Sequence, residues 1–512
     1  TLGEQSSYAA VGYTVQTGAV ALLVTSLYCR NCHTRYFPDY YVCRASERNS
    51  ERIYYSCPVP FISAAEYSFF DSQLWDWISQ QYAWAMWGIL IRTEACRSSF
   101  LPSVSAERIA IIYNQSMHLS RGYLADLSAE VVMDVFFIGA LLRWMARQER
   151  TLHVHHHSVQ SLRFEEAMKA RNRYIAGTGQ DQWAHACDGC MKVKTDAMGR
   201  RYRITACVMD GICIGHPCCS FKDADGLPCR VQLSTPRDRF CSTHSAEILV
   251  CAVRDCTSAR GAGFQTCNDS AHRTLENSLP QSGTSMRELL ARKERNAHAK
   301  AARSTGKSSK TRKGSKTAAV FRRTFTHNEQ LLVRPCGIIV SRCTMFQSEA
   351  ISAAKASADF VMSTFPETFP GSKPTYLFYD NNCQLHKYIA SPGHPKVQAY
   401  WLVINKPVDV FHFECKHAET DEVCQQHCNP ALFPDLMTEG RWTFNSSAAE
   451  QTNAWLVRFK TILREMGQTR YEFFLDEIIR MRNEWTVERL RKKGMSPHMV
   501  PQEDLRLAEI VL

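Results

Sequence analysis

The sequence predicts an α/β protein in which acidic residues gather at one edge of a mixed sheet. The apolar run 204–209 has the length of a strand and is followed by Asp210, and the run 376–379 is followed in the same way by Asp380. A third acid, Glu450, lies in a segment of helical periodicity. Two aspartates after strands and a later glutamate on a helix form the pattern of a nuclease-type carboxylate site.

The first aspartate also has a simpler interpretation. Asp210 precedes Gly211, and an Asp-Gly pair is a common turn, so Asp210 is expected to end its strand. Such a residue can serve the turn alone. The same arrangement at Asp380 favours a shared site.

Composition indicates a globular chain of two to four domains. It has 512 residues, of which 45% are hydrophobic and 11% aromatic, enough for a core. No apolar run reaches the roughly 18 residues that cross a bilayer, because the best candidate, 131–144, is interrupted by Asp134; no membrane partner is expected. Of the 22 cysteines, eleven lie between Cys187 and Cys267. This clustering predicts zinc sites in a reducing compartment.

The N-terminal 180 residues are predicted to form two parts. Residues 1–70 contain a CxxC pair, Cys29 and Cys32, which would supply half of a tetrahedral zinc site; a small β module without metal is the alternative. Residues 71–180 have helical spacing, with an aromatic-rich helix and an apolar helix at 130–147. We interpret the aromatic stripe as core.

Residues 181–280 are predicted to contain the first acid-bearing strand and a zinc cluster. Thiolate and imidazole groups suit tetrahedral zinc, which supplies folding energy where polar loops cannot bury a core. The ligands are enough for two four-ligand sites and part of a third if His216 joins. A RING-type ubiquitin ligase is a minor alternative, because the closing CxxC pair is missing. The predicted zinc ligands are Cys187, Cys190, Cys218, Cys219, Cys229, Cys241, His244, Cys251, Cys256, Cys267 and His272.

Residues 281–325 are predicted to form a flexible basic linker. The segment 286–323 holds thirteen Lys or Arg against two Glu, which accounts for the whole net charge of +11. A local basic run is the electrostatic signature expected for a phosphate backbone, although a solvated linker or a nuclear-import signal would look similar. The residues predicted to bind DNA are Lys300, Arg303, Lys307, Lys310, Arg312, Lys313 and Lys316.

The C-terminal part is predicted to complete the sheet. Residues 326–413 should contain two paired strands, a helix at 348–362, the strand before Asp380 and a further strand between 401 and 413. Residues 414–440 form an insertion whose CxxH pair, Cys424 and His427, is a possible metal site. Residues 441–490 carry the helix of Glu450, expected to run over 446–464, and residues 491–512 are a tail without a clear pattern.

Five segments together resemble a known family. They are WAHACDGC (183–190), ACVMDGICIGHPCC (206–219), RPCGIIVSR (334–342), FYDNNCQLHKY (378–388) and FNSSAAEQTNAW (444–455). The chain is similar over roughly residues 20–490 to fungal transposases of the Kyakuja-Dileera-Zisupton (KDZ) group with their associated cysteine clusters.

The resemblance implies an RNase H-like core, interrupted by the zinc cluster, with Asp210, Asp380 and Glu450 as a DDE catalytic triad. It implies Mg2+ or Mn2+ for catalysis, zinc for structure, DNA as transposon end and target, possible homo-oligomers and a nuclear location. The alternative is a catalytically inactive, zinc-dependent DNA-binding or interaction protein derived from a transposase.

Overall fold

The computed structural model shows a mixed α/β protein whose described residues form two compact units. Unit 1 comprises residues 1–216 and 326–512, and unit 2 comprises 217–325. The chain therefore leaves unit 1 within its fold and returns to complete it. The structure describes residues 2–44, 50–56, 59–65, 67–87, 105–117, 125–156, 159–223, 226–277, 319–346, 350–418 and 420–507.

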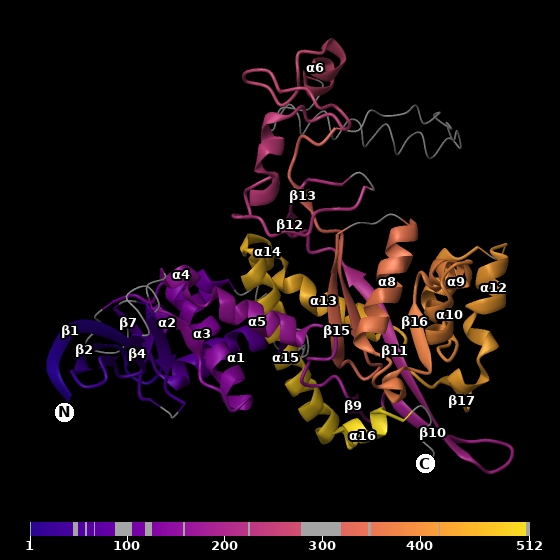
Figure 1. Cartoon of the computed structure of the whole chain (residues 1–512). Helices are drawn as coiled ribbons and strands as arrows, with labels where there is room; N and C mark the ends of the chain where they lie inside the picture. Colours follow the sequence, from indigo (N-terminus) through magenta and orange to yellow (C-terminus); the bar gives the residue numbers. More distant parts are fainter. Residues whose placement is uncertain are drawn as a thin grey trace. The chain divides into compact units, whose positions relative to one another are not determined.

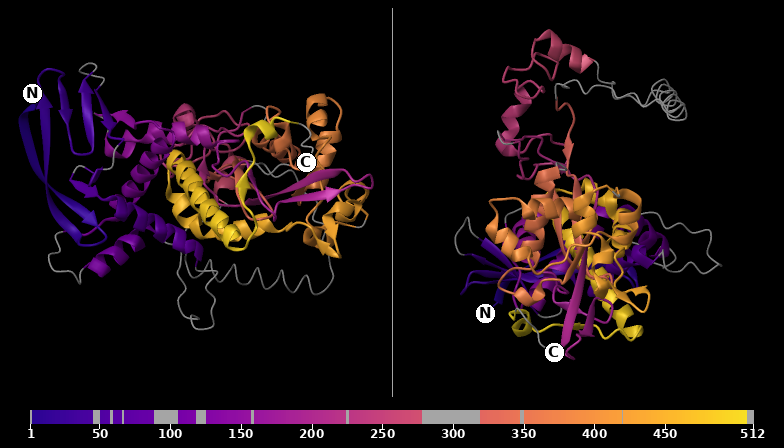
Figure 2. Two further views of the ribbon diagram at one scale, coloured as in Figure 1. Left: turned by 90° about the horizontal axis from the view of Figure 1, so that it is seen from below. Right: turned by 90° about the vertical axis from the view of Figure 1, so that its right-hand side faces the viewer.

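An eight-stranded sheet forms the N-terminal part of unit 1, in the order β6-β7-β1-β2-β3-β4-β5-β8. Its long antiparallel hairpin of β1 and β2 is visible in Figure 2. The last strand in this order, β8, pairs with β5. It lies within residues 71–180, the segment predicted to be helical. The strands are β1 (Leu2–Thr14), β2 (Gly18–Cys29), β3 (Thr34–Tyr36), β4 (Tyr40–Arg44), β5 (Ser50–Tyr54), β6 (Ile62–Ala65), β7 (Ser68–Phe70) and β8 (His153–His155).

The predicted aromatic and apolar helices follow this sheet and share its core. Helix α3 buries nine side chains, and Tyr82 of α1 and Phe136 of α3 stack edge to face with centroids 5.0 Å apart. The described part of the aromatic stripe is therefore core as predicted, with Trp75, Ile78 and Tyr82 buried; the side chains of its continuation at 84, 87 and 89 lie outside the described residues. No helix within the described ranges is long and apolar enough to cross a membrane. The helices are α1 (Ser72–Trp87), α2 (Ala106–Met117), α3 (Ala129–Arg147), α4 (Gln160–Arg163) and α5 (Glu165–Ile175).

A second, five-stranded sheet lies at the centre of unit 1. Its strands run β10-β11-β14-β15, with β16 on β11; β14 is antiparallel to both β11 and β15, whereas β16 is parallel to β11. The strands are β10 (Met191–Thr195), β11 (Arg201–Ile212), β14 (Asn328–Val333), β15 (Ile339–Met345) and β16 (Tyr376–Tyr379).

Helices cover both faces of this sheet, as Figure 1 shows with α8 and α9 on one side and α13 and α15 on the other. The alternation of side chains along β11 explains this arrangement: Ala206 and Val208 belong to the core shared with α13 and α15, while Cys207 and Met209 belong to the core shared with α8 and α9. Both faces are therefore buried, which is why the strand looks continuously apolar in sequence.

The remaining elements of unit 1 are short, apart from α8 with 15 residues and α15 with 25 residues. The helices are α8 (Ala350–Thr364), α9 (Asn382–Ala390), α10 (Pro395–Trp401), α11 (Val410–Lys416), α12 (Glu422–His427), α13 (Ala448–Leu456), α14 (Lys460–Glu465), α15 (Gln468–Lys492) and α16 (Gln502–Leu505), and the 3-10 turns are η2 (Pro370–Ser372), η3 (Pro430–Leu432), η4 (Pro434–Leu436) and η5 (Val457–Phe459). Short strands also pair outside the two large sheets, β9 (His185–Ala186) with β19 (His498–Met499) and β17 (Met437–Thr438) with β18 (Arg441–Trp442).

Three local predictions require correction. The pair Asp210-Gly211 is no turn, because β11 continues to Ile212 by pairing with β14. The strand expected between 401 and 413 is reduced to one parallel bridge at Asn405, and α11 follows instead. The helix expected over 446–464 is divided into α13, η5 and α14.

The described residues of unit 2, 217–223, 226–277 and 319–325, form little regular structure. They contain β12 (Pro217–Cys218) paired with β13 (Thr324–Phe325), the 3-10 helix η1 (Ser242–Leu249) and α6 (Ser270–Asn277). Within these described ranges, buried side chains of the unit form two small clusters built around cysteines.

Candidate active site and metal centres

The parallel pairing of β11 and β16 brings Asp210 and Asp380 to the same edge of the sheet. Met209 pairs with Tyr379, so the residue that follows each of them is an aspartate at the same level. Asp210 is held on β11 by its pairing with Leu331 of β14. A hydrogen bond of 2.8 Å from the Gly211 N–H to Oδ1 orients its carboxylate.

Glu450 comes to these aspartates from the first turn of α13. One turn further along α13, the Asn453 side chain donates a hydrogen bond of 2.8 Å to Oδ2 of Asp210. Asp210, Asp380 and Glu450 line one small hollow together with Asp409 and His412. The structure thus gathers the three predicted acids, although they come from two strands and a helix.

His412 lies at the centre of this cluster of carboxylates. Its Nδ1 lies 2.8 Å from Oδ1 of Asp380 and 3.2 Å from Oδ2 of Asp409, and its Nε2 lies 3.1 Å from Oε1 of Glu450. The side chain is only 7% exposed. The imidazole therefore contacts three carboxylates that would otherwise face one another.

The sequence prediction missed His412 because the segment was interpreted as a strand. Asp409 caps α11, and its carboxylate accepts a hydrogen bond from the His412 N–H. An acid three residues before the capped N–H is a helix-start signal. That signal was present in the sequence and would have replaced the strand by a helix.

Burial raises the pKa of two of the acids. For Asp210, removal from water is the largest cause of the raised pKa; the Gly211 N–H opposes it and the charge of Asp380 reinforces it. For Glu450, burial again comes first, and the His412 ring opposes the rise in pKa. Both carboxylates are thus harder to ionise than in water, and a nearby positive charge would relieve this.

In unit 2, cysteine and histidine side chains form two separate groups of four. Cys219, Cys229, Cys241 and His244 form the first, and Cys251, Cys256, Cys267 and His272 form the second. In each group the ligand atoms lie within 4.8 Å of one another. Three thiolates and one imidazole complete a tetrahedral zinc set.

Distances within the two groups are similar. Sγ of Cys241 lies 3.8 Å from Sγ of Cys229 and 3.3 Å from Nδ1 of His244. Sγ of Cys267 lies 3.9 Å from Sγ of Cys256 and 3.3 Å from Nδ1 of His272. Eight of the predicted ligands therefore fall into two four-ligand sets.

The remaining predicted ligands of the cluster lie elsewhere. Cys218 is buried in β12, burial raises its pKa to about 12, and it belongs to none of the candidate groups among the described residues. His216, which was considered for a third site, places Nε2 3.0 Å from the backbone oxygen of Met466. Cys187 and Cys190 join His185 and Cys336 in a group within unit 1.

Near the acids, a three-ligand group replaces the predicted CxxH pair. Cys424 lies with Cys383 and His417, and its Sγ is 3.1 Å from Nδ1 of His417. His427 instead stacks on His386, with ring centroids 4.3 Å apart. The difference lies in burial, since Cys424 is 0% exposed and faces the interior, whereas His427 lies at an exposed position at the end of α12.

At the N-terminus, Cys29 and Cys32 flank the turn between β2 and β3. Hydrogen bonds, first from Thr34 and then from Cys29, lower the pKa of Cys32 to about 7. Within the described ranges neither residue belongs to a group of three candidate ligands. Lys300, Arg303, Lys307, Lys310, Arg312, Lys313 and Lys316 lie outside the described residues.

Comparison with protein families assigns the two cysteine-rich segments. Residues 1–117 match the family model described as a CxC5 like cysteine cluster associated with KDZ transposases. Residues 208–278 match the model of a CxC6 like cysteine cluster associated with the same transposases. No curated protein and no solved structure matches the chain. The predicted resemblance is confirmed at the level of the KDZ type, and the fungal origin stays a prediction.

Proposed function

From the premise that the two cysteine clusters mark the chain as KDZ-type and transposase-related, we propose that it is a DDE-type DNA transposase that cleaves and transfers DNA strands. The observation that carries the proposal is the convergence of Asp210, Asp380 and Glu450 on one hollow. These residues are 170 and 70 positions apart in the chain.

The proposal includes an RNase H-like core. Three antiparallel strands, β15, β14 and β11, followed by β16 parallel to β11, support it. This order places Asp210 on β11 beside Asp380, which follows β16. Unit 2 is then an insertion between β11 and β14, outside the sheet.

The residues present fit a hard divalent cation. Asp210, Asp380 and Glu450 would hold it, because their carboxylate oxygens are the ligands that Mg2+ and Mn2+ prefer. Oδ1 of Asp409 is buried without a hydrogen-bond partner among the described residues, which adds an uncompensated acceptor beside them. When bound, such ions neutralise charge on the scissile phosphate and activate the attacking oxygen.

The chain's own residues prepare the acids for this role. Asn453 and the Gly211 N–H fix both oxygens of Asp210, so the carboxylate is rigid before any substrate arrives. His412 holds Asp380 and Glu450 within reach of one imidazole. A rigid set of carboxylates is what precise positioning of a phosphodiester requires.

The same histidine favours a second candidate function. Because His412 contacts three carboxylates, the cluster already holds a side chain of its own between the acids. A chain that has lost catalysis could keep this arrangement as structure and act as a zinc-dependent DNA-binding or interaction protein derived from a transposase. Metal binding by the acids separates the two functions.

The first test is Mn2+ binding to the full-length protein, followed by nicking of supercoiled plasmid DNA. Asp210→Asn should abolish both, while Asp359→Asn, at an exposed position on α8, should abolish neither. Zinc content should be the same in the two variants. Wild-type Mn2+ affinity in Asp210→Asn would refute the DDE site, and a wild type that binds no Mn2+ would favour the inactive relative.

DNA binding is proposed to depend on the basic segment 286–323. Lys and Arg on a chain without fixed base contacts give affinity with little sequence specificity. Deleting the segment should flatten the slope of log affinity against log salt concentration, measured with duplex DNA. An unchanged slope would mean that the folded units, and not this segment, make the phosphate contacts. A nuclear location and homo-oligomer formation are further parts of the proposal.

A further inference from the structure

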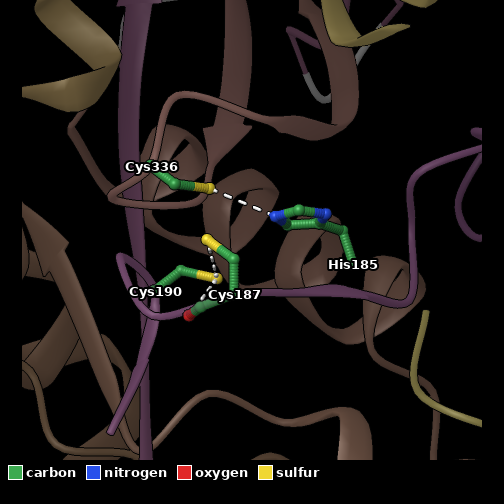
Figure 3. Close-up of side chains that lie close together, drawn as sticks. All are labelled: His185, Cys187, Cys190 and Cys336. Carbon is green, nitrogen blue, oxygen red and sulfur yellow. Dashed lines mark hydrogen bonds between the residues drawn. The ribbon is translucent and has the colours of Figure 1, made fainter. Parts of the chain in front are cut away.

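Four side chains of unit 1 that neither matched family segment contains converge at one end of the central sheet. His185, Cys187 and Cys190 come from the segment before β10, and Cys336 comes from the turn between β14 and β15. Figure 3 shows the three sulfur atoms and the imidazole pointing toward a common centre. Their ligand atoms all lie within 4.8 Å of one another.

Local structure fixes the first three positions. His185 lies on β9, where it pairs with Met499 of β19. Cys187 begins a tight turn, since its backbone oxygen accepts hydrogen bonds from the N–H groups of Cys190 (3.1 Å) and Met191 (3.0 Å). The turn brings Sγ of Cys187 and Cys190 to 3.7 Å.

A hairpin turn presents the fourth residue. Arg334 and Ile338 close the turn through a backbone hydrogen bond of 2.7 Å, and Gly337 supplies the left-handed conformation with φ of 95°. Pro335 comes directly before Cys336, and its ring fixes its own backbone φ at about −65°. Cys336 is therefore held on a rigid loop facing the CxxC turn.

Two of the ligand-to-ligand distances match the edges of a tetrahedron around zinc, and all four ligand atoms lie within 4.8 Å of one another. With Zn–S near 2.3 Å and Zn–N near 2.0 to 2.1 Å, tetrahedral geometry gives S···S of about 3.8 Å and S···N of about 3.5 to 3.6 Å. The Cys187 to Cys190 sulfur separation is 3.7 Å. Nε2 of His185 lies 3.5 Å from Sγ of Cys336.

A disulfide or a set of reactive surface thiols would fit these four residues less well than a metal ion. A separation of 3.7 Å between Sγ of Cys187 and Cys190 excludes a disulfide, in which the sulfur atoms lie about 2.05 Å apart. Three of the four side chains are almost fully buried, with His185 2%, Cys187 1% and Cys190 2% exposed, and Cys336 is half-buried. The Gly189 N–H also points at Sγ of Cys187, 3.4 Å away, an orientation that stabilises a metal-bound thiolate.

We propose that His185, Cys187, Cys190 and Cys336 bind a structural Zn2+ that closes the end of the central sheet. Four protein ligands leave no open position, so the site is structural rather than catalytic. It joins the segment before β11 to the β14–β15 hairpin, and through β9 it reaches the C-terminal strand β19. It is independent of the DNA chemistry proposed above.

Zinc content of two matched variants tests the site. In the full-length protein, Cys336→Ser should lower zinc by about one ion per chain, measured by elemental analysis. Cys343→Ser, seven residues away on β15 and in none of the candidate groups among the described residues, should not change it. Cys336→His should keep the ion, and in the Co2+-substituted protein it should weaken the sulfur-to-metal charge-transfer band. Equal zinc content in folded Cys336→Ser and Cys343→Ser would overturn the proposal.

A measurement on the wild type covers the case in which Cys336→Ser does not fold. Maleimide labelling followed by mass spectrometry should show Cys187, Cys190 and Cys336 protected together. All three should become reactive when a chelator removes the metal, whereas exposed Cys415 should react throughout. Equal labelling rates of the three thiols before and after metal removal would refute the site.

Discussion

Asn453 on α13 donates a hydrogen bond of 2.8 Å to Oδ2 of Asp210 on β11, across 243 residues of sequence. The bond ties the helix of Glu450 to the strand of the first aspartate. Asn453 is 8% exposed, so its amide has no easy replacement by water. It is therefore a positioning residue for the acid cluster.

Replacing Asn453 by alanine should loosen this cluster without removing any acid. A hydrogen bond to a charged group contributes about 1.5 to 3 kcal/mol, so we expect Mn2+ to bind at least tenfold more weakly. Because this bond lowers the pKa of Asp210, its loss should also move the onset of Mn2+ binding to higher pH. Isothermal titration at several pH values measures both effects.

The control for this variant is Asn445→Ala, which alters an exposed asparagine before α13. It should leave both the affinity and its pH dependence unchanged. Equal behaviour of the two variants would show that the Asn453 bond does not position Asp210.

His412→Ala should increase the stabilisation of the protein by Mn2+. Without the imidazole, Asp380 and Glu450 lose the group that contacts both, and like charges at short range repel. We therefore expect a lower melting temperature without metal and a larger upward shift on adding Mn2+. Thermal unfolding with and without the ion measures this difference.

His394→Ala provides the comparison, because His394 is an exposed histidine before α10. The melting temperature of His394→Ala should rise on adding Mn2+ by as much as that of the wild type. If Mn2+ stabilised His412→Ala no more than wild type, the imidazole would not be the group that relieves repulsion between Asp380 and Glu450 when no metal is bound.

Stability should depend on pH through Asp134, the acid that interrupts the apolar helix α3. Burial raises the pKa of Asp134 to about 6, although the Arg470 charge opposes the rise. A carboxyl whose pKa is higher in the folded state favours folding when protonated, and this advantage is lost as pH rises from about 4 through about 6. Asp134→Asn replaces the carboxyl by a neutral amide, so the variant does not lose stability through ionisation at this position as pH rises.

The free energy of unfolding of Asp134→Asn should therefore exceed that of wild type increasingly with pH. We expect a gain of about 1.5 kcal/mol at pH 5 and about 3 kcal/mol at pH 7.5, as upper values from the shift. Urea unfolding at both pH values measures it. A gain that is constant between them would mean that Asp134 titrates as in the unfolded chain; Asp359→Asn should give no gain at either pH.

The acids were predictable from sequence, whereas their neighbours were not. Asp210 and Asp380 follow apolar runs, and runs of this kind are visible locally. His412 was missed because the apolar residues around it also suit a strand, and the capping role of Asp409 was not weighed. Cys336 was missed because a lone cysteine carries no spacing signal when its partners lie about 150 residues away in the chain.

The thiol group behind the acid cluster leads to the last prediction. Cys383 lies on α9, just after Asp380, and His417 ends α11, the helix that carries His412. Cys424 on α12 completes the group, with Sγ 3.1 Å from Nδ1 of His417. A zinc ion here would fix the two helices that hold Asp380 and His412.

Cys424→Ser should therefore lower the zinc content and also weaken Mn2+ binding at the acids, because helices α9 and α11 would lose their common anchor. Changes to the groups that orient metal ligands typically cost about 10- to 100-fold in affinity. Cys415→Ser, at an exposed position on α11, should alter neither quantity. Elemental analysis and Mn2+ titration of the two variants decide the matter: zinc loss with unchanged Mn2+ affinity would separate the sites, and unchanged zinc would show that Cys383, His417 and Cys424 hold no ion.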